Sequence, residues 1–374
     1  MSNHNLAVSA VVLAAGEGTR MRSSRPKPLH RLCGRPMVLH VLDALAELEL
    51  QRAVVVVGHG AERVTKALLQ HTVARLQVEF VEQHVQRGTG DAVAVALTAF
   101  PDDDDDDGGD IVVLPGDTPL LRPPTLAALV RAHRQARAAA TVMTAVLDSP
   151  TGYGRIVRGK DERVARIVEE ADATDEERAI REVNTGIYAF RRAVLAPALR
   201  RLSPDNIQGE YYLTDIVGVL HDAGYPVTSL VVADSMEVAG VNDRAQLAVA
   251  EAELRDRINE RWMRRGVTMI DPERTYVDTS VSLAPDVTLF PGTLLQGTTA
   301  IATGAEIGPN SHLVDCVVGS RATVANSVAR AAEIGADAVV GPYATILPGG
   351  RVAPGTVTGP YFIGRSDDEE VGAP

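Results

Sequence analysis

Between residue 8 and about residue 242, short runs of β-branched and other apolar residues alternate with segments whose apolar positions recur at helical spacing. This alternation is typical of a parallel β-sheet flanked by helices. Strands are expected at residues 8–14, 53–58, 78–82, 111–114 and 141–147. Helices are expected around residues 37–48, 62–69, 89–99 and 125–136. The first two thirds of the chain therefore predict an α/β domain.

A longer helical pattern follows this domain. Leu254, Ile258 and Trp262 recur at the spacing of one helix face, and Gly266 follows as a stop signal. We expect a helix over residues 246–265 that joins two domains.

Beyond Gly266 the apolar period changes to six residues, and glycine or proline punctuates most of the hexads. Such a period is typical of a hexapeptide β-helix, in which each hexad buries one side chain. Between Val318 and Ile334 the phase slips, which we interpret as a loop or an imperfect coil. Ordinary short strands in a small sandwich are the alternative. The period is carried by Val281, Val287, Thr293 and Thr299, by Ile301, Ile307 and Leu313, and by Ile334, Val340, Ile346 and Val352.

Composition and charge narrow the class of protein. A length of 374 residues predicts two or three domains, and an apolar content of 45% is enough for sizeable cores. The 49 acidic and 37 basic residues give a net charge of −12, the opposite of the basic surface that binds nucleic acid or anionic lipid. We therefore expect no nucleic-acid partner and no membrane association.

Other segments carry weaker signals. Cys33 and Cys316 cannot form a disulfide framework and lack metal-ligand spacing, so both are expected to be reduced and structural. No apolar run approaches the ~18 residues of a membrane span, which predicts a cytoplasmic protein. The aspartate run at 102–107 is interpreted as a solvated loop rather than a cation site, and residues 365–374 as a disordered tail.

The strongest chemical signal follows the first predicted strand. Leu-Ala-Ala-Gly-Glu-Gly-Thr-Arg-Met occupies residues 13–21, and Pro-Lys-Pro-Leu-His occupies residues 26–30. Glycines at a strand end let backbone N–H groups approach a triphosphate, and Arg20 and Lys27 can balance its charge. The spacing matches neither a dinucleotide fingerprint nor a Walker loop. A lone Gly-x-Gly would indicate an ordinary turn, but the adjoining Thr-Arg-Met and Pro-Lys favour phosphate binding.

With these residues the chain resembles the sugar-1-phosphate nucleotidylyltransferases. It is most similar to the N-terminal uridylyltransferase half of the bifunctional N-acetylglucosamine-1-phosphate uridylyltransferase/glucosamine-1-phosphate acetyltransferase family, from about residue 8 to about residue 350. The matching motifs include Val-Gly-His-Gly at 57–60, Gly-Thr-Gly at 88–90, Gly-Asp at 116–117, Thr-Gly-Tyr-Gly-Arg-Ile at 151–156, Asn-Thr-Gly-Ile-Tyr at 184–188, Gly-Glu-Tyr-Tyr-Leu-Thr-Asp at 209–215 and Gly-Val-Asn at 240–242.

The resemblance implies a fold and a reaction. The fold would be a Rossmann-like nucleotidylyltransferase domain at 1–245, a connecting helix at 246–265, and a short left-handed parallel β-helix of hexapeptide repeats at 266–364. The reaction would convert UTP and N-acetylglucosamine 1-phosphate to UDP-N-acetylglucosamine and pyrophosphate with Mg²⁺ as cofactor. Two alternatives remain open: a related enzyme acting on another sugar or pseudo-sugar 1-phosphate, and a catalytically silent paralogue that binds nucleotide-sugar.

The resemblance also implies roles for particular residues. Arg20, Lys27 and Asp117 would be catalytic, and Asp117 and Asn242 would hold Mg²⁺. The combination of these four residues argues against the silent paralogue. The implied nucleotide-binding residues are Leu13, Ala14, Ala15, Gly16, Gly18, Gln83, Gly88 and Thr89, and the implied sugar-binding residues are Gly154, Glu169, Asn184, Tyr211 and Thr214.

The chain also departs from the family pattern. Asp91 replaces a common histidine after Gly-Thr-Gly, and Pro115 precedes the Gly-Asp motif. In the β-helix, Leu347 stands where the acetyltransferase site has an arginine in a Leu-Arg-Pro-Gly turn, and the last histidine of the sequence is His312. We therefore expect no acetyl transfer, and a β-helix that serves to assemble a homotrimer.

Overall fold

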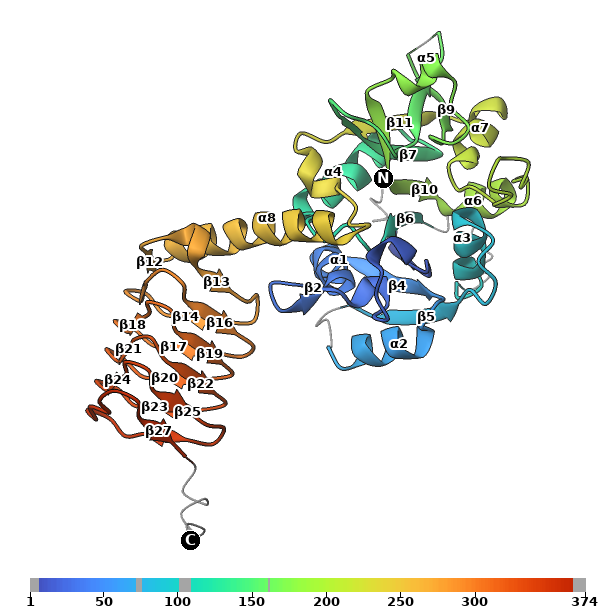
Figure 1. Ribbon diagram of the computed structural model, residues 1–374. Coiled ribbons are helices and arrows are strands. Elements are labelled where there is room, and N and C mark those ends of the chain that lie inside the picture. Colours follow the sequence, from blue (N-terminus) through green and yellow to red (C-terminus); the bar gives the residue numbers. More distant parts are fainter. Residues whose placement is uncertain (1–6, 72–75, 101–108, 161, 366–374) are drawn as a thin grey trace, which may run out of the picture. The chain divides into compact units, whose positions relative to one another are not determined.

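The computed structural model describes residues 7–71, 76–100, 109–160 and 162–365 (Figure 1). The chain forms two compact units, one made of Met1–His30 with Pro36–Leu247 and the other of Arg31–Arg35 with Ala248–Pro374. The aspartate run at 102–107 and residues 366–374 of the expected tail lie outside the described residues. Within the part of the chain that the structure covers, no helix is long and apolar enough to cross a membrane.

The assignment of Arg31–Arg35 to the second unit differs from the division expected from the sequence. The reason is a set of contacts made by Cys33, which is only 5% exposed. The Cys33 N–H donates to Glu251 Oε2 over 2.9 Å, and the Thr279 N–H donates to the Cys33 carbonyl over 3.0 Å. This short segment, which includes β2 (Arg31–Leu32), thus belongs to the core of the second unit.

The first unit is built on a mixed sheet with the strand order β11-β7-β10-β6-β1-β4-β5. Neighbouring strands in this order are parallel except for β10, which runs antiparallel to both β6 and β7. The strands are β1 (Val8–Ala14), β4 (Leu50–Val57), β5 (Val78–Glu82), β6 (Asp110–Pro115), β7 (Ala140–Val146), β10 (Glu182–Arg191) and β11 (Val227–Val231). The expected strands are present, with ends shifted by no more than three residues.

The antiparallel β10 corrects the expectation of an all-parallel sheet. After β7 the chain forms a hairpin of β8 (Arg155–Arg158) and β9 (Val164–Val168), then the short helix α5 (Asp175–Arg178). It re-enters the sheet at β10 beside β7. Among the described residues between β7 and β10, no crossover helix returns the chain to the edge at which β7 begins, so β10 runs antiparallel to β7.

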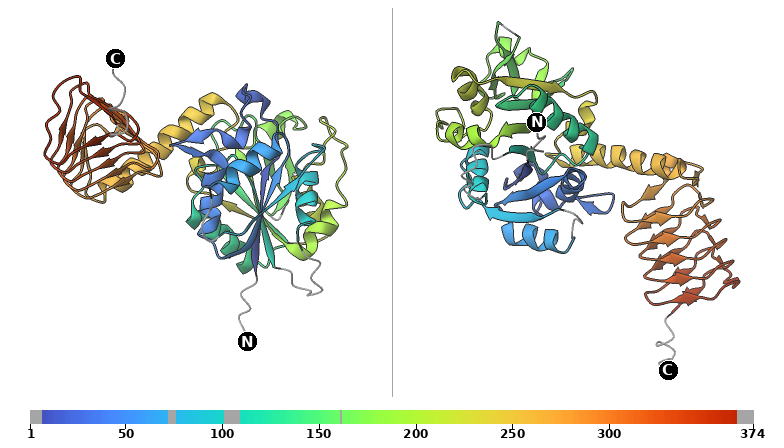
Figure 2. Two further views of the ribbon diagram at one scale, coloured as in Figure 1. Left: turned by 90° about the horizontal axis from the view of Figure 1, so that it is seen from below. Right: turned by 180° about the vertical axis from the view of Figure 1, so that it is seen from behind.

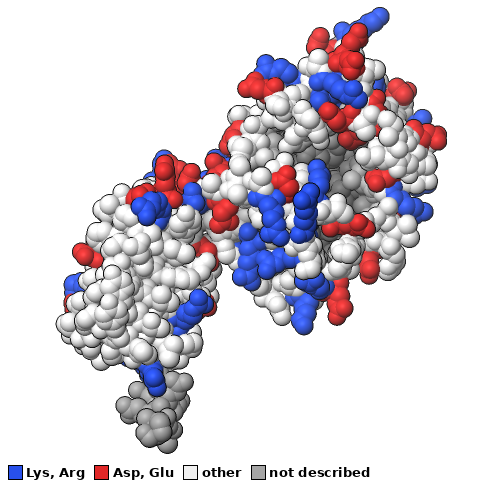
Figure 3. Space-filling view, viewed as in Figure 1, with Lys and Arg blue, Asp and Glu red and all other residues white. Residues whose placement is uncertain are grey.

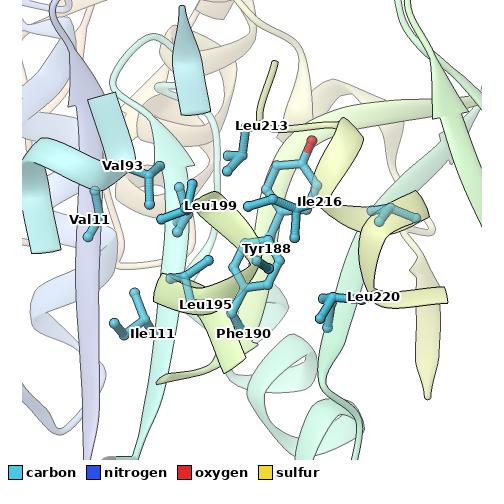
Figure 4. Packing of buried hydrophobic residues seen from close by; sticks show 14 of the residues in the cluster. Val11, Val93, Ile111, Tyr188, Phe190, Leu195, Leu199, Leu213, Ile216 and Leu220 are labelled. Atoms are coloured by element: carbon cyan, nitrogen blue, oxygen red, sulfur yellow. The ribbon is translucent and has the colours of Figure 1, made fainter. Parts of the chain in front are cut away.

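Helices cover both faces of this sheet (Figure 2). One core packs α3, α6 and α7 against the sheet, and the other packs α1, α2 and α4. Figure 4 shows the first of these cores, where the rings of Tyr188 and Phe190 stack with centroids 5.4 Å apart. The helices are α1 (Met37–Ala46), α2 (Ala61–Leu69), α3 (Thr89–Leu97), α4 (Pro123–Gln135), α6 (Arg192–Leu199) and α7 (Asp215–Asp222), and the 3₁₀ turns are η1 (Thr19–Met21), η2 (Lys27–Leu29) and η3 (Ser235–Val238).

The long helix α8 (Arg244–Met263) confirms the helix expected over 246–265 and leads into a left-handed parallel β-helix. Ile258 and Trp262 of α8 are buried with the first coils of the β-helix. Three parallel sheets form the walls in the described part of this unit (Figures 1 and 2). They contain β12 (Thr268–Met269), β15 (Thr288–Leu289), β18 (Glu306–Ile307), β21 (Thr323–Val324) and β24 (Val339–Val340); β13 (Tyr276–Val277), β16 (Leu294–Gln296), β19 (His312–Val314), β22 (Val328–Arg330), β25 (Thr345–Ile346) and β27 (Ile363–Gly364); and β14 (Ser282–Leu283), β17 (Ala300–Ile301), β20 (Val317–Val318), β23 (Glu333–Ile334) and β26 (Arg351–Val352). The hairpin strand β3 (Arg35–Pro36) and the turn η4 (Pro272–Arg274) complete the described elements.

The hexad residues named from the sequence are all buried inside the coils. The slip after Val318 is an imperfect coil, and the alternative of a small sandwich is wrong. Strands β13, β16, β19, β22, β25 and β27 begin 18, 18, 16, 17 and 18 residues apart, so two successive coils are short. Asp315 and Asn326 turn two of the shortened corners with φ values of 54° and 47°. Both residue types tolerate the left-handed region, which allows a corner to lose one residue while the ladders continue in register.

Candidate active site

The glycine-containing segment after β1 lines a cavity of about 370 Å³ at the carboxyl end of the central strands. Leu13, Ala14, Ala15 and Gly16 form one wall. A Cβ built on Gly16 would meet no atom within 4 Å, so its backbone borders open space. Ligands of α/β sheets bind at this edge, where strand ends and helix starts present backbone N–H groups.

Four of the sequence-predicted residues converge beside this wall. Lys27 Nζ donates to Asp117 Oδ2 and, over 2.8 Å, to Asn242 Oδ1. Arg20 Nη2 donates to the same Asn242 oxygen over 3.0 Å. The Lys27 and Asp117 side chains are 14% and 22% exposed, so the ion pair is largely shielded from water. Residues up to 222 positions apart in the chain thus build one polar cluster.

Gly18 lies away from the cavity and supports Lys27. It has a φ of 64°, and a Cβ on Gly18 would lie 2.6 Å from the Lys27 Cβ. The backbone of the loop therefore passes directly against the lysine stem because residue 18 has no side chain. Arg20, Arg22 and Arg25 are exposed around this turn. Figure 3 shows Lys and Arg side chains gathered on one part of this unit's surface, although the chain as a whole is acidic.

The cavity extends to the start of α3. Gln83, Gly88 and Thr89, to which the resemblance assigns nucleotide binding, line this end. Gln83 Nε2 donates to the Gly88 carbonyl over 3.2 Å and to Asp91 Oδ2 over 2.8 Å. Gly88 has a φ of 109°, and a Cβ there would lie 2.6 Å from the Tyr211 carbonyl. The structure thus needs glycine at residue 88 for the close approach of two backbones.

The opposite end of the cavity is lined by Glu169, Asn184 and Thr214. Thr214 Oγ1 donates to Glu169 Oε1 over 3.0 Å, and the Asn184 N–H donates to the Gly154 carbonyl over 2.8 Å. Burial raises the pKa of the Glu169 carboxyl, the hydrogen bond from Thr214 lowers it, and the nearby Asp215 raises it further. Gly154 does not line the cavity but faces Glu169, whose Oε2 would lie 3.4 Å from a Cβ at residue 154.

Tyr211 supports the site from outside the cavity. Its carbonyl accepts the Gly90 N–H, and its own N–H donates to the Arg87 carbonyl, each over 2.8 Å. Tyr211 thereby connects the segment before α7 to the start of α3. Tyr211 also lines a second hollow of about 650 Å³ on the other side of α3.

Sequence reasoning missed several residues that line the cavity. Gln86 is the clearest case, because its Nε2 donates to the Ala15 carbonyl over 2.7 Å and so fixes the glycine-containing wall. No motif marked it, although it lies three residues after Gln83. Tyr188 was within a quoted motif but was not assigned to the site. The other lining residues without an assignment are Pro28, Ala92, Pro115, Gly116, Gly186, Glu210 and Leu213.

The polar cluster also contains oxygen atoms of the kind that bind divalent cations. Asp117 and Asn242 offer a carboxylate and an amide oxygen, which are ligands that Mg²⁺ prefers. The Lys27 ammonium contacts both oxygens, so they already converge on a positive charge. Among the described residues, no group of three or more His, Cys, Asp and Glu side chains is arranged to hold a metal ion. A cation here would therefore rest on two protein ligands together with oxygens of a substrate.

Comparisons with known proteins identify the family of this chain. Residues 9–263 match the family model described as nucleotidyl transferase. A bifunctional protein GlmU from Streptomyces avermitilis is 48% identical over 354 residues, which cover 94% of this chain and 72% of the relative. Proteins of the same name from Desulfitobacterium hafniense and Brevibacillus brevis are 46% and 45% identical over 91% and 95% of this chain, and over 73% and 75% of their own lengths. The chain therefore belongs to the bifunctional GlmU family and is a nucleotidyltransferase of the UDP-N-acetylglucosamine diphosphorylase type.

Proposed function

We propose that this enzyme transfers a uridylyl group from UTP to N-acetylglucosamine 1-phosphate, giving UDP-N-acetylglucosamine and pyrophosphate. The observation that carries the proposal is the convergence of Arg20, Lys27, Asp117 and Asn242 beside a cavity with two different ends. One end offers the amide of Gln83, and the other offers the carboxylate of Glu169 and the amide of Asn184. The amide at one end can pair with the edge of a base, and the carboxylate and amide at the other end can bind the polar groups of a sugar. The charged cluster beside the cavity can bind the phosphates between them.

The reaction needs no covalent enzyme intermediate. A phosphate oxygen of the sugar phosphate attacks the α-phosphorus of the nucleotide in line, the bond to the β-phosphate breaks, and pyrophosphate leaves. Arg20 and Lys27 offset the negative charge that spreads over the phosphate oxygens, and N–H groups of the wall at 13–16 bind the leaving phosphates. Glu169 and Asn184 orient the hydroxyl and acetamido groups of the sugar.

Asp117 and Asn242 would hold Mg²⁺, since their oxygens suit this ion. Bound Mg²⁺ supplies charge neutralisation to the nucleotide phosphates. Lys27 then has two tasks, because its ammonium is held by the same two oxygens and must also contact phosphate.

The proposal is tested by a pyrophosphate-release screen of ATP, CTP, GTP and UTP against three acceptors: N-acetylglucosamine, glucosamine and glucose 1-phosphates. We expect turnover with UTP and N-acetylglucosamine 1-phosphate in the presence of Mg²⁺, and none after chelation of the metal. Turnover confined to another sugar 1-phosphate would establish the related enzyme instead. Absence of turnover in every combination would leave the silent nucleotide-sugar-binding protein.

We further propose that the β-helix has no acetyltransferase activity and assembles a homotrimer. The first part is supported by Leu347, an apolar side chain at the position where the resemblance requires arginine. The second is supported by exposed apolar residues on one wall of the β-helix. Tyr276, Val328 and Ile363 begin β13, β22 and β27 of one sheet and are 42%, 38% and 56% exposed. Closed symmetric contact would remove such a face from water.

A further inference from the structure

The orientation of the Gln83 side-chain amide is determined by two acceptors. Gln83 is 5% exposed, and its Nε2 contacts the Gly88 carbonyl and Asp91 Oδ2. A backbone carbonyl and an ion-paired carboxylate offer lone pairs but no proton. The atom of Gln83 that faces them must therefore be the nitrogen, since the reversed amide would place oxygen against two oxygens.

This orientation leaves the Gln83 oxygen for a ligand. Among the described residues, no donor is hydrogen-bonded to Oε1 of Gln83. This oxygen is also not among the fully buried side-chain atoms that lack a partner, so it is accessible from outside the protein. Because Gln83 lines the cavity, its side-chain oxygen is a hydrogen-bond acceptor that a ligand can reach at this end of the cavity.

Asp91 is itself held firmly. Arg87 Nη2 donates to Asp91 Oδ1 over 2.8 Å, and Asp91 Oδ2 accepts the hydrogen bond from Gln83 Nε2. Asp91 lies in the first turn of α3, where the N–H groups of the helix favour a negative charge. It does not line the main cavity but borders the second hollow across α3, so it lies behind Gln83 rather than beside a ligand.

We propose that Asp91 is a positioning residue that sets the base specificity of the enzyme by holding the Gln83 amide in one orientation. This inference rests on the proposed uridylyl transfer and names how its base is selected. Asp91 does not contact the nucleotide. Its effect passes through the amide of Gln83, with Arg87 keeping the carboxylate in place.

The selection follows from the edge of the base. N3 of uracil carries a proton between two carbonyl groups, so it can donate to the Gln83 oxygen. N3 of cytosine carries a lone pair, which would face that oxygen without a proton between them. The fixed amide therefore favours uracil over cytosine. It does not separate uracil from 5-methyluracil, which has the same N3–H.

The test compares Asp91→Asn with the wild-type enzyme using UTP, CTP and 5-methyl-UTP at a saturating sugar phosphate concentration. Asparagine has one side-chain oxygen for two donors, Arg87 and Gln83, so the Gln83 amide can reverse and offer its nitrogen to cytosine. We expect the ratio of kcat/KM for UTP over CTP to fall about 2- to 12-fold, the range of one hydrogen bond. The change should lie in KM for the nucleotide, with KM for the sugar phosphate unaltered. The ratio of UTP over 5-methyl-UTP should stay at the wild-type value.

Asp148→Asn is the matched control, because Asp148 is an exposed acidic residue paired with Arg181 in the same unit. It should leave all three nucleotides unchanged. A wild-type UTP-over-CTP ratio in Asp91→Asn, with the protein folded, overturns the inference while the proposed function stands. An equal loss for all three nucleotides also overturns it, because a merely structural role would act in that way. A wild-type enzyme that does not use UTP overturns the proposed function itself.

Discussion

Replacement of Lys27 by alanine separates the catalytic from the structural role of this side chain. In the folded protein Lys27 donates to Asp117 and Asn242, and more than three quarters of each ion-paired side chain is shielded from water. Loss of one partly buried pair costs about 1 kcal/mol of stability, which lowers the melting temperature of a unit of this size by about 2 to 4 °C. Loss of a contact to charge developing in the transition state costs about 3 to 4 kcal/mol, or 10²- to 10³-fold in kcat.

The two effects are measured by pyrophosphate release and by thermal unfolding on the same preparation. Lys27→Arg retains the charge but replaces a compact ammonium by a planar fork, so we expect it to recover stability and only part of the rate. Lys66→Ala removes an exposed lysine from α2 and serves as the matched control, with no change in rate. If Lys27→Ala stays within fivefold of the wild-type kcat while remaining folded, the charge of Lys27 plays no part in phosphoryl transfer.

Three further outcomes are expected. Burial raises the pKa of the Glu169 carboxyl, so this group stabilises the folded state at low pH, and its contribution is lost as the pH rises through the raised pKa. Glu169→Gln should therefore be at least as stable as the wild type at pH 7 by thermal unfolding. Its KM for the sugar phosphate should rise about tenfold. Acetyl-CoA and glucosamine 1-phosphate should release no free thiol above the enzyme-free rate, since Leu347 cannot supply the missing positive charge, and thiol release would refute this. Light scattering coupled to size exclusion should give a trimer for the full chain and a monomer for a chain that ends at Arg264. The shorter chain should also be less stable, because Cys33 loses its hydrogen-bond partner Thr279. A trimeric shorter chain would place the interface elsewhere.

The coarse fold could be predicted because its signals are local and repeated. The hexad residues Ile301 and Val340 each report an inward position at a fixed period, so a few errors do not disturb the interpretation. The direction of β10 carries no such signal, since an antiparallel strand buried on both faces resembles a parallel one in sequence. The placement of Cys33 also has no local signal, because its partners Glu251 and Thr279 lie more than 200 residues away.

In the candidate site, too, some residues could be predicted from the sequence and others could not. Lys27 could be proposed from the sequence because its residue type and its place after the glycine-containing turn point to phosphate chemistry, whereas the role of Asp117 was implied only by the resemblance to the family. Gln86 was not found, since a glutamine whose task is to hold a backbone carbonyl has no characteristic neighbours. The sequence marked Asp91 only as a departure from a pattern. Its hydrogen bond with Gln83 could not be predicted from the sequence, because it depends on how the end of β5 lies against the first turn of α3.

The segment Arg31–Arg35 has a consequence for the order in which the protein folds. The Cys33 carbonyl and the Thr279 hydroxyl that donates to it are 246 residues apart in the chain. At roughly 5 to 20 residues per second, a ribosome needs about 12 to 50 s to proceed from one to the other. During that time the segment has emerged but cannot complete its hydrogen bonds, whereas most of the α/β sheet can form. The first coil of the β-helix is therefore completed by a segment that was synthesised long before it. The second unit can mature only if this early segment stays available while the first unit is being made.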